Sequence, residues 1–225
     1  MTYIDVHTHN KNIPVGTFAI VSIDLTLRLS HDISYAKGVF YSAGVHPWHP
    51  DVRMMPTVRA LAAMPEIIAI GETGLDKLTA GKYSDFTRQR TLFIEHIHLS
   101  EEVAKPMIIH CVKSHNEIIS IHRELKPKMP WIIHGFRGNQ QIAKELLYEG
   151  FYLSFSIPYN KYALLSAWRN DRLLIETDDK PLSIDKVYEL IATDLQVSVE
   201  ILSQEIAVHQ QNSVFGQRYP ITKGM

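Results

Sequence analysis

Six side chains of the kinds that bind divalent metals follow five separate apolar segments of the chain. They are His7, His9, Glu72, His110, His134 and Asp178. The apolar segments before them, residues 3–6, 67–70, 107–109, 131–133 and 173–175, have the length of β-strands. Because side chains alternate along a strand, His7 and His9 point to one face and can hold one ion together. Imidazole and carboxylate donors without a thiolate favour Zn, Mn, Ni or Fe over a structural cysteine site.

The strands that position these residues alternate with amphipathic helices. Residues 17–23, 39–43 and 151–155 also read as strands, which brings the number to eight. Helical patterns are expected over residues 56–64, 85–104, 115–125, 139–149, 159–168, 184–193 and 198–209. This alternation predicts a (β/α)8 TIM-type barrel, whose active site lies at the carboxyl ends of the strands. Only residues 10–16 separate His9 from the second strand, which is too short for a crossover helix, so either the first helix is missing or the second strand is paired unusually.

Composition sets the frame for this prediction. The chain has 225 residues, 45% of them hydrophobic, and is expected to form a single domain over residues 1–225. A net charge of -1 gives no general attraction to nucleic acid, so a polyanion has to be bound by a local patch or by metal ions. No apolar stretch approaches a membrane span and the start lacks a basic, apolar leader, so we expect a cytoplasmic protein without a membrane partner. The only cysteine, Cys111, excludes an internal disulfide and is expected to point away from His110.

The order of several short motifs resembles the TatD-like metal-dependent hydrolases, the TatD DNase family of amidohydrolase-type barrels. The motifs are DVHTH at residues 5–9, GVHP at 44–47, GETGLD at 71–76, IH at 109–110, HGFRG at 134–138 and ETD at 176–178. Each motif alone is weak, but the set in this order and spacing is specific. The resemblance implies a two-metal phosphodiester hydrolase, with the six residues named above as ligands of two divalent ions such as Zn, Mn, Mg or Ni.

Within that implied site, chemistry gives each ligand a role. Glu72 is the candidate bridge between one ion held by His7 and His9 and a second held by His110 and His134. Asp178 is expected to complete the first site and to accept a proton from the bound water, which makes Asp178 and Glu72 the catalytic carboxylates.

The residues expected to bind substrate lie after the ligand strands. They are His46, Lys113, Arg137 and Lys180, which belong with Lys77 and Lys161 to the expected mouth of the barrel. His46 precedes Pro47 and is equally open to the interpretation that it only shapes a loop. Asp76 is read as a site residue on the strength of the resemblance, and Asp5 as a residue that orients a ligand.

These expectations lead to a function with stated alternatives. The chain is expected to be a deoxyribonuclease that acts on DNA ends, because the missing first helix and the short connection after Asp178 leave low walls around the site. The alternatives are hydrolysis of small phosphoesters, amides or lactones on the same metal centre, or a metal-binding scaffold without turnover. The expected partner is DNA or a small phosphodiester, and no obligate protein partner is inferred.

Overall fold

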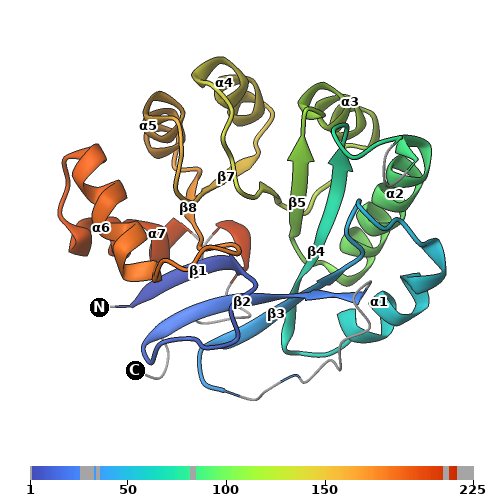
Figure 1. The fold of residues 1–225 in the computed structure, drawn as a ribbon, viewed down its shortest axis with the longest axis horizontal. Helices are drawn as coiled ribbons and strands as arrows, with labels where there is room; N and C mark the ends of the chain where they lie inside the picture. The colour runs from blue at the N-terminus through green and yellow to red at the C-terminus, as the bar shows by residue number, and fades with distance from the viewer. Residues whose placement is uncertain (1, 26–32, 34–35, 82–84, 210–212, 217–225) are drawn as a thin grey trace. The chain divides into compact units, whose positions relative to one another are not determined.

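Eight parallel strands follow the chain order in one sheet, β1 to β8 (Figure 1). The computed structural model describes residues 2–25, 33, 36–81, 85–209 and 213–216. The strands are β1 Tyr3–Thr8, β2 Thr17–Asp24, β3 Val39–Gly44, β4 Ile67–Asp76, β5 Met107–Val112, β6 Trp131–Ile133, β7 Tyr152–Phe155 and β8 Leu173–Ile175. The predicted fold class, a (β/α)8 barrel, is therefore confirmed.

Helices follow most of the strands, as predicted. They are η2 Val52–Met54, α1 Met55–Ala62, α2 Phe86–Val103, α3 His115–Leu125, α4 Gln140–Tyr148, α5 Lys161–Arg169, α6 Ile184–Leu195 and α7 Val199–His209. Residues 9–16, between β1 and β2, contain no helix, so the first of the two expected alternatives, a missing first helix, is confirmed. Among the described residues, no helix has the length and apolar character needed to span a membrane.

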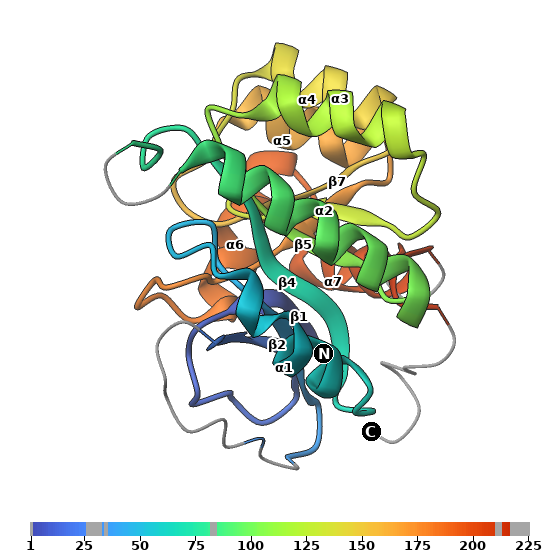
Figure 2. The same ribbon diagram turned by 90° about the vertical axis from the view of Figure 1, so that its right-hand side faces the viewer.

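The chain divides into two compact units, each described here by itself. Unit 1 comprises Met1–Val21, Tyr35–Phe40 and His134–Met225, and unit 2 comprises Ser22–Ser34 and Tyr41–Ile133. In unit 1, α4 and α5 lie side by side (Figure 1). In unit 2, α2 packs along β4 (Figure 2). The sequence predicted one domain over residues 1–225, which would contain both units, and this stays a prediction.

Strand β4 is longer than the sequence pattern indicated. The apolar run ends at Ile70, but the strand continues to Asp76 and all ten of its residues are buried. Gly74 makes this possible, since its φ is 147° and a Cβ there would lie 2.1 Å from the carbonyl oxygen of His110. Only glycine permits so close an approach between β4 and β5. Glu72 and Asp76 therefore lie inside a strand, beside His110, and not in a loop after it.

Helix α2 carries a buried histidine that ties it to β3. Leu92, Phe93 and Ile97 form the apolar face of the helix, and His96 lies among them without solvent exposure. The amide of Val45 donates to Nε2 of His96 at 3.1 Å, so the ring proton is on Nδ1 and is donated to the carbonyl of Leu92 at 2.8 Å. Both ring nitrogens are satisfied in the neutral form, and burial lowers the pKa of His96 to about 4.

Acid should therefore weaken the fold through His96. An unfolded histidine titrates near pH 6.5, so between pH 6.5 and 4 the unfolded chain binds the proton and the folded chain does not. The stabilisation is present above pH 6.5 and is lost as pH falls toward 4, by roughly 2 kcal/mol between pH 7 and pH 5. Urea unfolding at both pH values, in chelator, should show this loss in the wild type and a smaller loss in His96→Gln. The exposed His98 on the same helix provides the control, and equal pH dependence of His96→Gln and His98→Gln would contradict the assignment.

Candidate metal-binding site

In unit 1, the backbone brings Asp178 beside His7 of β1 and His9, the residue after it. The amide of Asp178 donates to the carbonyl of His7, and the amide of His9 donates to the carbonyl of Asp178, both at 3.0 Å. Thr8 and Asp178 thus form a parallel bridge. Asp178 has a φ of 57°, a left-handed conformation that aspartate and asparagine tolerate better than most residues. This pairing places Asp178, and no other residue of the segment after β8, beside His7 and His9.

The distances in this first cluster fit a shared ion. Oδ1 of Asp178 lies 3.8 Å from Nε2 of His7 and 3.8 Å from Nε2 of His9. These separations are too long for hydrogen bonds. Two ligands, each about 2.0 to 2.2 Å from one ion, are at most about 4.2 Å apart. Donor atoms of His7, His134 and Asp178 also lie within 4.8 Å of one another. The donor set and its spacing are therefore suited to a divalent metal.

His134 is held in this cluster by a carboxylate to which the sequence analysis gave no role. Glu176 has no solvent exposure, and its Oε1 lies 3.5 Å from Nδ1 of His134 and accepts from the amide of Gly135 at 2.8 Å. Burial raises the pKa of Glu176, but the contacts with His134 and His7 outweigh it and hold the pKa below its usual value. A carboxylate behind a ligand histidine fixes its ring and tautomer. Glu176 stands two residues before Asp178 in the ETD motif, and this spacing is the sequence feature from which its place near the site could have been predicted.

The carboxylate of Asp5 contacts Thr177, the neighbour of Asp178, and the backbone of His7. Its carboxylate accepts from the amide of Thr177 at 3.0 Å and from the hydroxyl of Thr177 at 2.7 Å. Burial raises the pKa of Asp5 to about 7, although the hydrogen bonds from Thr177 oppose this. Asp5 therefore positions the strand end that carries Asp178, and its expected role in orienting a ligand stays a prediction.

In unit 2, a second cluster gathers around one carboxylate oxygen of Glu72. Oε1 of Glu72 lies 2.8 Å from Nδ1 of His110 and 3.1 Å from Nε2 of His46. Oδ2 of Asp76 lies 3.3 Å from Nε2 of His110 and accepts from the indole N–H of Trp48 at 2.8 Å. Burial raises the pKa of Asp76, but the hydrogen bonds from His110 and Trp48 outweigh it and hold the pKa well below its usual range.

Both ring nitrogens of His110 face carboxylates. Nε2 of His110 faces Asp76 and Nδ1 faces Glu72, so a neutral ring, which carries one proton, leaves a lone pair facing one of the two carboxylates. A lone pair this close to a carboxylate oxygen is unfavourable without a cation between them. The arrangement fits a doubly protonated ring, or an ion bound by both atoms, since ligands about 2.1 Å from an ion at a right angle lie about 3 Å apart. Glu72 and His110 are therefore suited to hold a metal.

For His46, a backbone hydrogen bond assigns the ring nitrogens. The amide of Trp48 donates to Nδ1 of His46 at 3.2 Å, so the ring proton of the neutral form is on Nε2. That proton points to Glu72, which makes His46 a hydrogen-bond donor at the site. His46, Glu72 and His110 lie close enough to hold one ion together, but this tautomer favours a donor role for His46. The sequence analysis placed His46 with the substrate contacts, and the geometry is compatible with that placement.

The cations expected at the mouth have different partners. Lys77 pairs with Glu117, Lys161 with Asp194 and Lys180 with Asp179. Over the part of the chain that the structure describes, Lys113 and Arg137 take part in no salt bridge. Among the cations expected at the mouth, these two are therefore the ones whose charge is not already paired with a carboxylate in the described part of the chain. Cys111 is not a candidate ligand, because burial raises the pKa of its thiol to about 12.

Asp76 should act on metal affinity through His110. Asp76→Asn removes the charge that faces Nε2, so the ring loses part of its orientation and basicity. Substitutions of this kind lower metal affinity by about 10- to 100-fold. Titration of the chelator-treated protein with zinc or manganese, followed by calorimetry, measures this change. Asp51→Asn, at an exposed carboxylate that caps η2, should leave the affinity unchanged; a matching affinity in Asp76→Asn would remove Asp76 from the site.

Comparisons with known proteins identify the family of this chain. The family model described as TatD related DNase matches residues 5–212. The uncharacterized metal-dependent hydrolase YcfH of Escherichia coli (strain K12) is 34% identical over 199 residues, which are 79% of this chain and 74% of the relative. The 3'-5' ssDNA/RNA exonuclease TatD of Cronobacter turicensis is 34% identical over 154 residues, which are 63% of this chain and 57% of that enzyme.

Solved structures show the same fold. The crystal structure of YJJV, a TatD homologue from Escherichia coli K12, superposes with a TM-score of 0.76 at 18% identity, over 92% of this chain and 96% of that one. A TatD family hydrolase from Entamoeba histolytica gives 0.73 at 16% identity, over 95% and 98%. The chain therefore belongs to the TatD family of metal-dependent hydrolases, enzymes that act on ester bonds.

Proposed function

We propose that this chain hydrolyses phosphodiester bonds at the ends of single-stranded DNA. The observation that carries the proposal is the pair of imidazole and carboxylate clusters, around Asp178 and around Glu72, in a chain of the TatD family. A relative named as a single-strand exonuclease supports the substrate class. The absent helix between β1 and β2 supports the preference for ends, because less protein surrounds the ligand strands.

Two divalent ions are part of the proposal. All six candidate ligands lie on, or within three residues after, the carboxyl halves of parallel strands in one sheet, which is the edge where barrel enzymes place their sites. His7, His9 and Asp178 are suited to one ion, and Glu72 with His110 to another. His134 stands beside His7, with ring centroids 4.4 Å apart. We assign the bridging role to Glu72. Such ions, when bound, lower the pKa of a coordinated water and stabilise charge on a phosphoryl group.

The side chains supply the remaining steps. Asp178 accepts a proton from the attacking water, because its carboxylate lies among imidazoles and is partly open to solvent. Nε2 of His46 donates a hydrogen bond to an oxygen of the phosphate, in place of its hydrogen bond to Glu72. Lys113 and Arg137 attract further phosphates of the strand. Because only these two cations are proposed to attract phosphates, the protein is proposed to contact only the terminal nucleotides of the strand.

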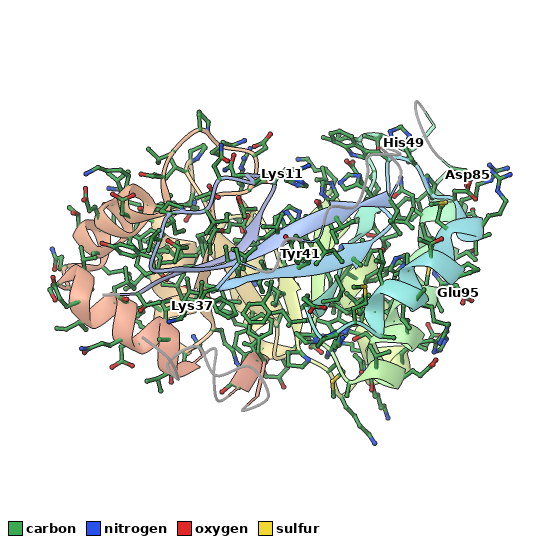
Figure 3. All side chains as sticks on the ribbon, turned by 90° about the horizontal axis from the view of Figure 1, so that it is seen from below. Lys11, Lys37, Tyr41, His49, Asp85 and Glu95 are labelled. Atoms are coloured by element: carbon green, nitrogen blue, oxygen red, sulfur yellow. The ribbon has the colours of Figure 1, made fainter. Side chains whose placement is uncertain are left out.

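The metal content tests the role of Glu72. Protein purified without chelator is expected to contain about two divalent ions per chain, and Glu72→Ala about one or fewer, because a bridging carboxylate contributes to both sites. Elemental analysis of the two proteins measures this. Glu95→Ala, which removes an exposed carboxylate of α2, should keep the wild-type content (Figure 3). An unchanged content in Glu72→Ala would contradict the bridging assignment.

The activity is tested on end-labelled single strands, matched duplexes and closed single-stranded circles, with RNA and a small chromogenic diester in parallel. Linear single strands should be degraded fastest, and a chelator should abolish the reaction. Asp178→Asn is the matched variant, since asparagine also tolerates the left-handed backbone but cannot take the proton. It should lower kcat on the order of 10² to 10⁴-fold at saturating metal.

Other outcomes of this assay have clear meanings. Circles cleaved as fast as linear strands would contradict the preference for ends. Turnover of small phosphoesters, amides or lactones without cleavage of any nucleic acid would replace the proposed substrate. No turnover of any substrate by metal-loaded protein would point to a metal-binding scaffold.

A further inference from the structure

A large aromatic residue stands beside the second cluster and remains open to solvent. Trp48 is 46% exposed, although its ring centroid lies 4.9 Å from that of His46 and 6.2 Å from that of His110. Tryptophan carries a large apolar surface whose burial stabilises whatever complex covers it. An exposed tryptophan next to candidate metal ligands is therefore placed to contact the substrate of those ligands.

The ring of Trp48 is fixed before any substrate arrives. Its indole N–H donates to Asp76 at 2.8 Å, and its backbone amide donates to Nδ1 of His46 at 3.2 Å. These bonds use the polar edge of the residue, while 46% of the residue remains exposed. Fixing a side chain in the binding orientation lowers the entropic cost of binding.

We propose that Trp48 stacks on the base of the nucleotide whose phosphate lies at the second cluster, around Glu72, an inference that rests on the proposed function. Base stacking on an aromatic side chain tolerates any sequence, because every base has a π-face. The face of an unpaired terminal base is accessible, whereas both faces of an internal base pair are covered by its neighbours. The same residue therefore selects single strands and frayed ends over duplex.

The chain after Trp48 leads to a cavity that leaves room for a neighbouring nucleotide. Residues 49–53 and the first turns of α2 line a cavity of about 600 Å³ in unit 2. His49 and Asp85 lie on the same side of this unit (Figure 3). Asp51 is paired with Arg53, and Asp85 caps α2. Arg88, also in the lining, takes part in no salt bridge among the described residues, and is the cation that a phosphate there would meet.

The test compares a nucleotide with the same molecule without its base. Deoxyadenosine 5'-monophosphate and deoxyribose 5-phosphate carry the same phosphate and lack the diester bond of the proposed substrate. Release of inorganic phosphate is followed in parallel, so that turnover of either monoester is detected. Wild-type protein, with the metal content it has when purified, should bind the nucleotide about tenfold more tightly by calorimetry. Trp48→Ala should bind both ligands equally, and Trp48→Phe should retain most of the difference. The nucleotide should also quench tryptophan fluorescence in the wild type but not in Trp48→Phe.

Each outcome supports or overturns the stacking role. Tyr148→Ala, which removes an 88% exposed aromatic ring from α4, serves as the control and should keep the tenfold preference. If Trp48→Phe loses as much as Trp48→Ala, the bond to Asp76 matters and the stacking role is wrong. If Trp48→Ala keeps the preference, the base binds elsewhere. A preference that depends on Trp48, in a protein that cleaves no oligonucleotide, would retain this site and overturn the proposed function.

Discussion

The parallel bridge between β1 and the segment after β8 is the constraint on which the first cluster depends. Its two backbone hydrogen bonds place Asp178 between His7 and His9, so a carboxylate 170 residues away in sequence meets an His-X-His pair. Backbone bonds of this kind are more rigid than side-chain contacts, and the positive φ of Asp178 turns its carboxylate toward the imidazoles. Asp5 and Thr177 add a buried polar contact that holds the same strand end.

A second principle is the carboxylate behind the imidazole. Glu176 holds Nδ1 of His134, and Asp76 holds Nε2 of His110. In each case the carboxylate faces one ring nitrogen, at 3.5 Å in His134 and 3.3 Å in His110. Both carboxylates are buried, and both have lowered pKa values because the neighbouring donors outweigh the cost of burial. The cost of burying these charges is thus offset by contacts that also orient the rings.

The absent helix after β1 changes what surrounds the first cluster. In unit 1, the loop at residues 10–14 and the segment at residues 180–184 line a cavity of about 230 Å³ that reaches Asp5 and Thr177. A helix in this connection would have enclosed the strand ends more fully. Under the proposed function, the exposed Trp48 in unit 2 provides the kind of surface that an unpaired base requires.

The sequence by itself determined the fold class and the candidate ligands. Period-two apolar runs and helical periodicity are local properties, so the eight strands, the following helices and the missing first helix were predictable from them. His7, His9, Glu72, His110, His134 and Asp178 were found because ligand-type residues followed successive strands. The continuation of β4 to Asp76 was missed, since Gly71 and Gly74 interrupt the apolar pattern and their need arises only from the close approach of β5.

Only the tertiary structure decided which supporting residues touch which ligands. Glu176 and Trp48 are ordinary residues in sequence, and their contacts with His134 and Asp76 depend on strand register and side-chain direction. The ion pairs of Lys77 and Lys161 likewise join positions 40 and 33 residues apart, which no local pattern encodes. A local pattern fixes how a segment folds, whereas the partner of a polar side chain is set by the segments that pack beside it.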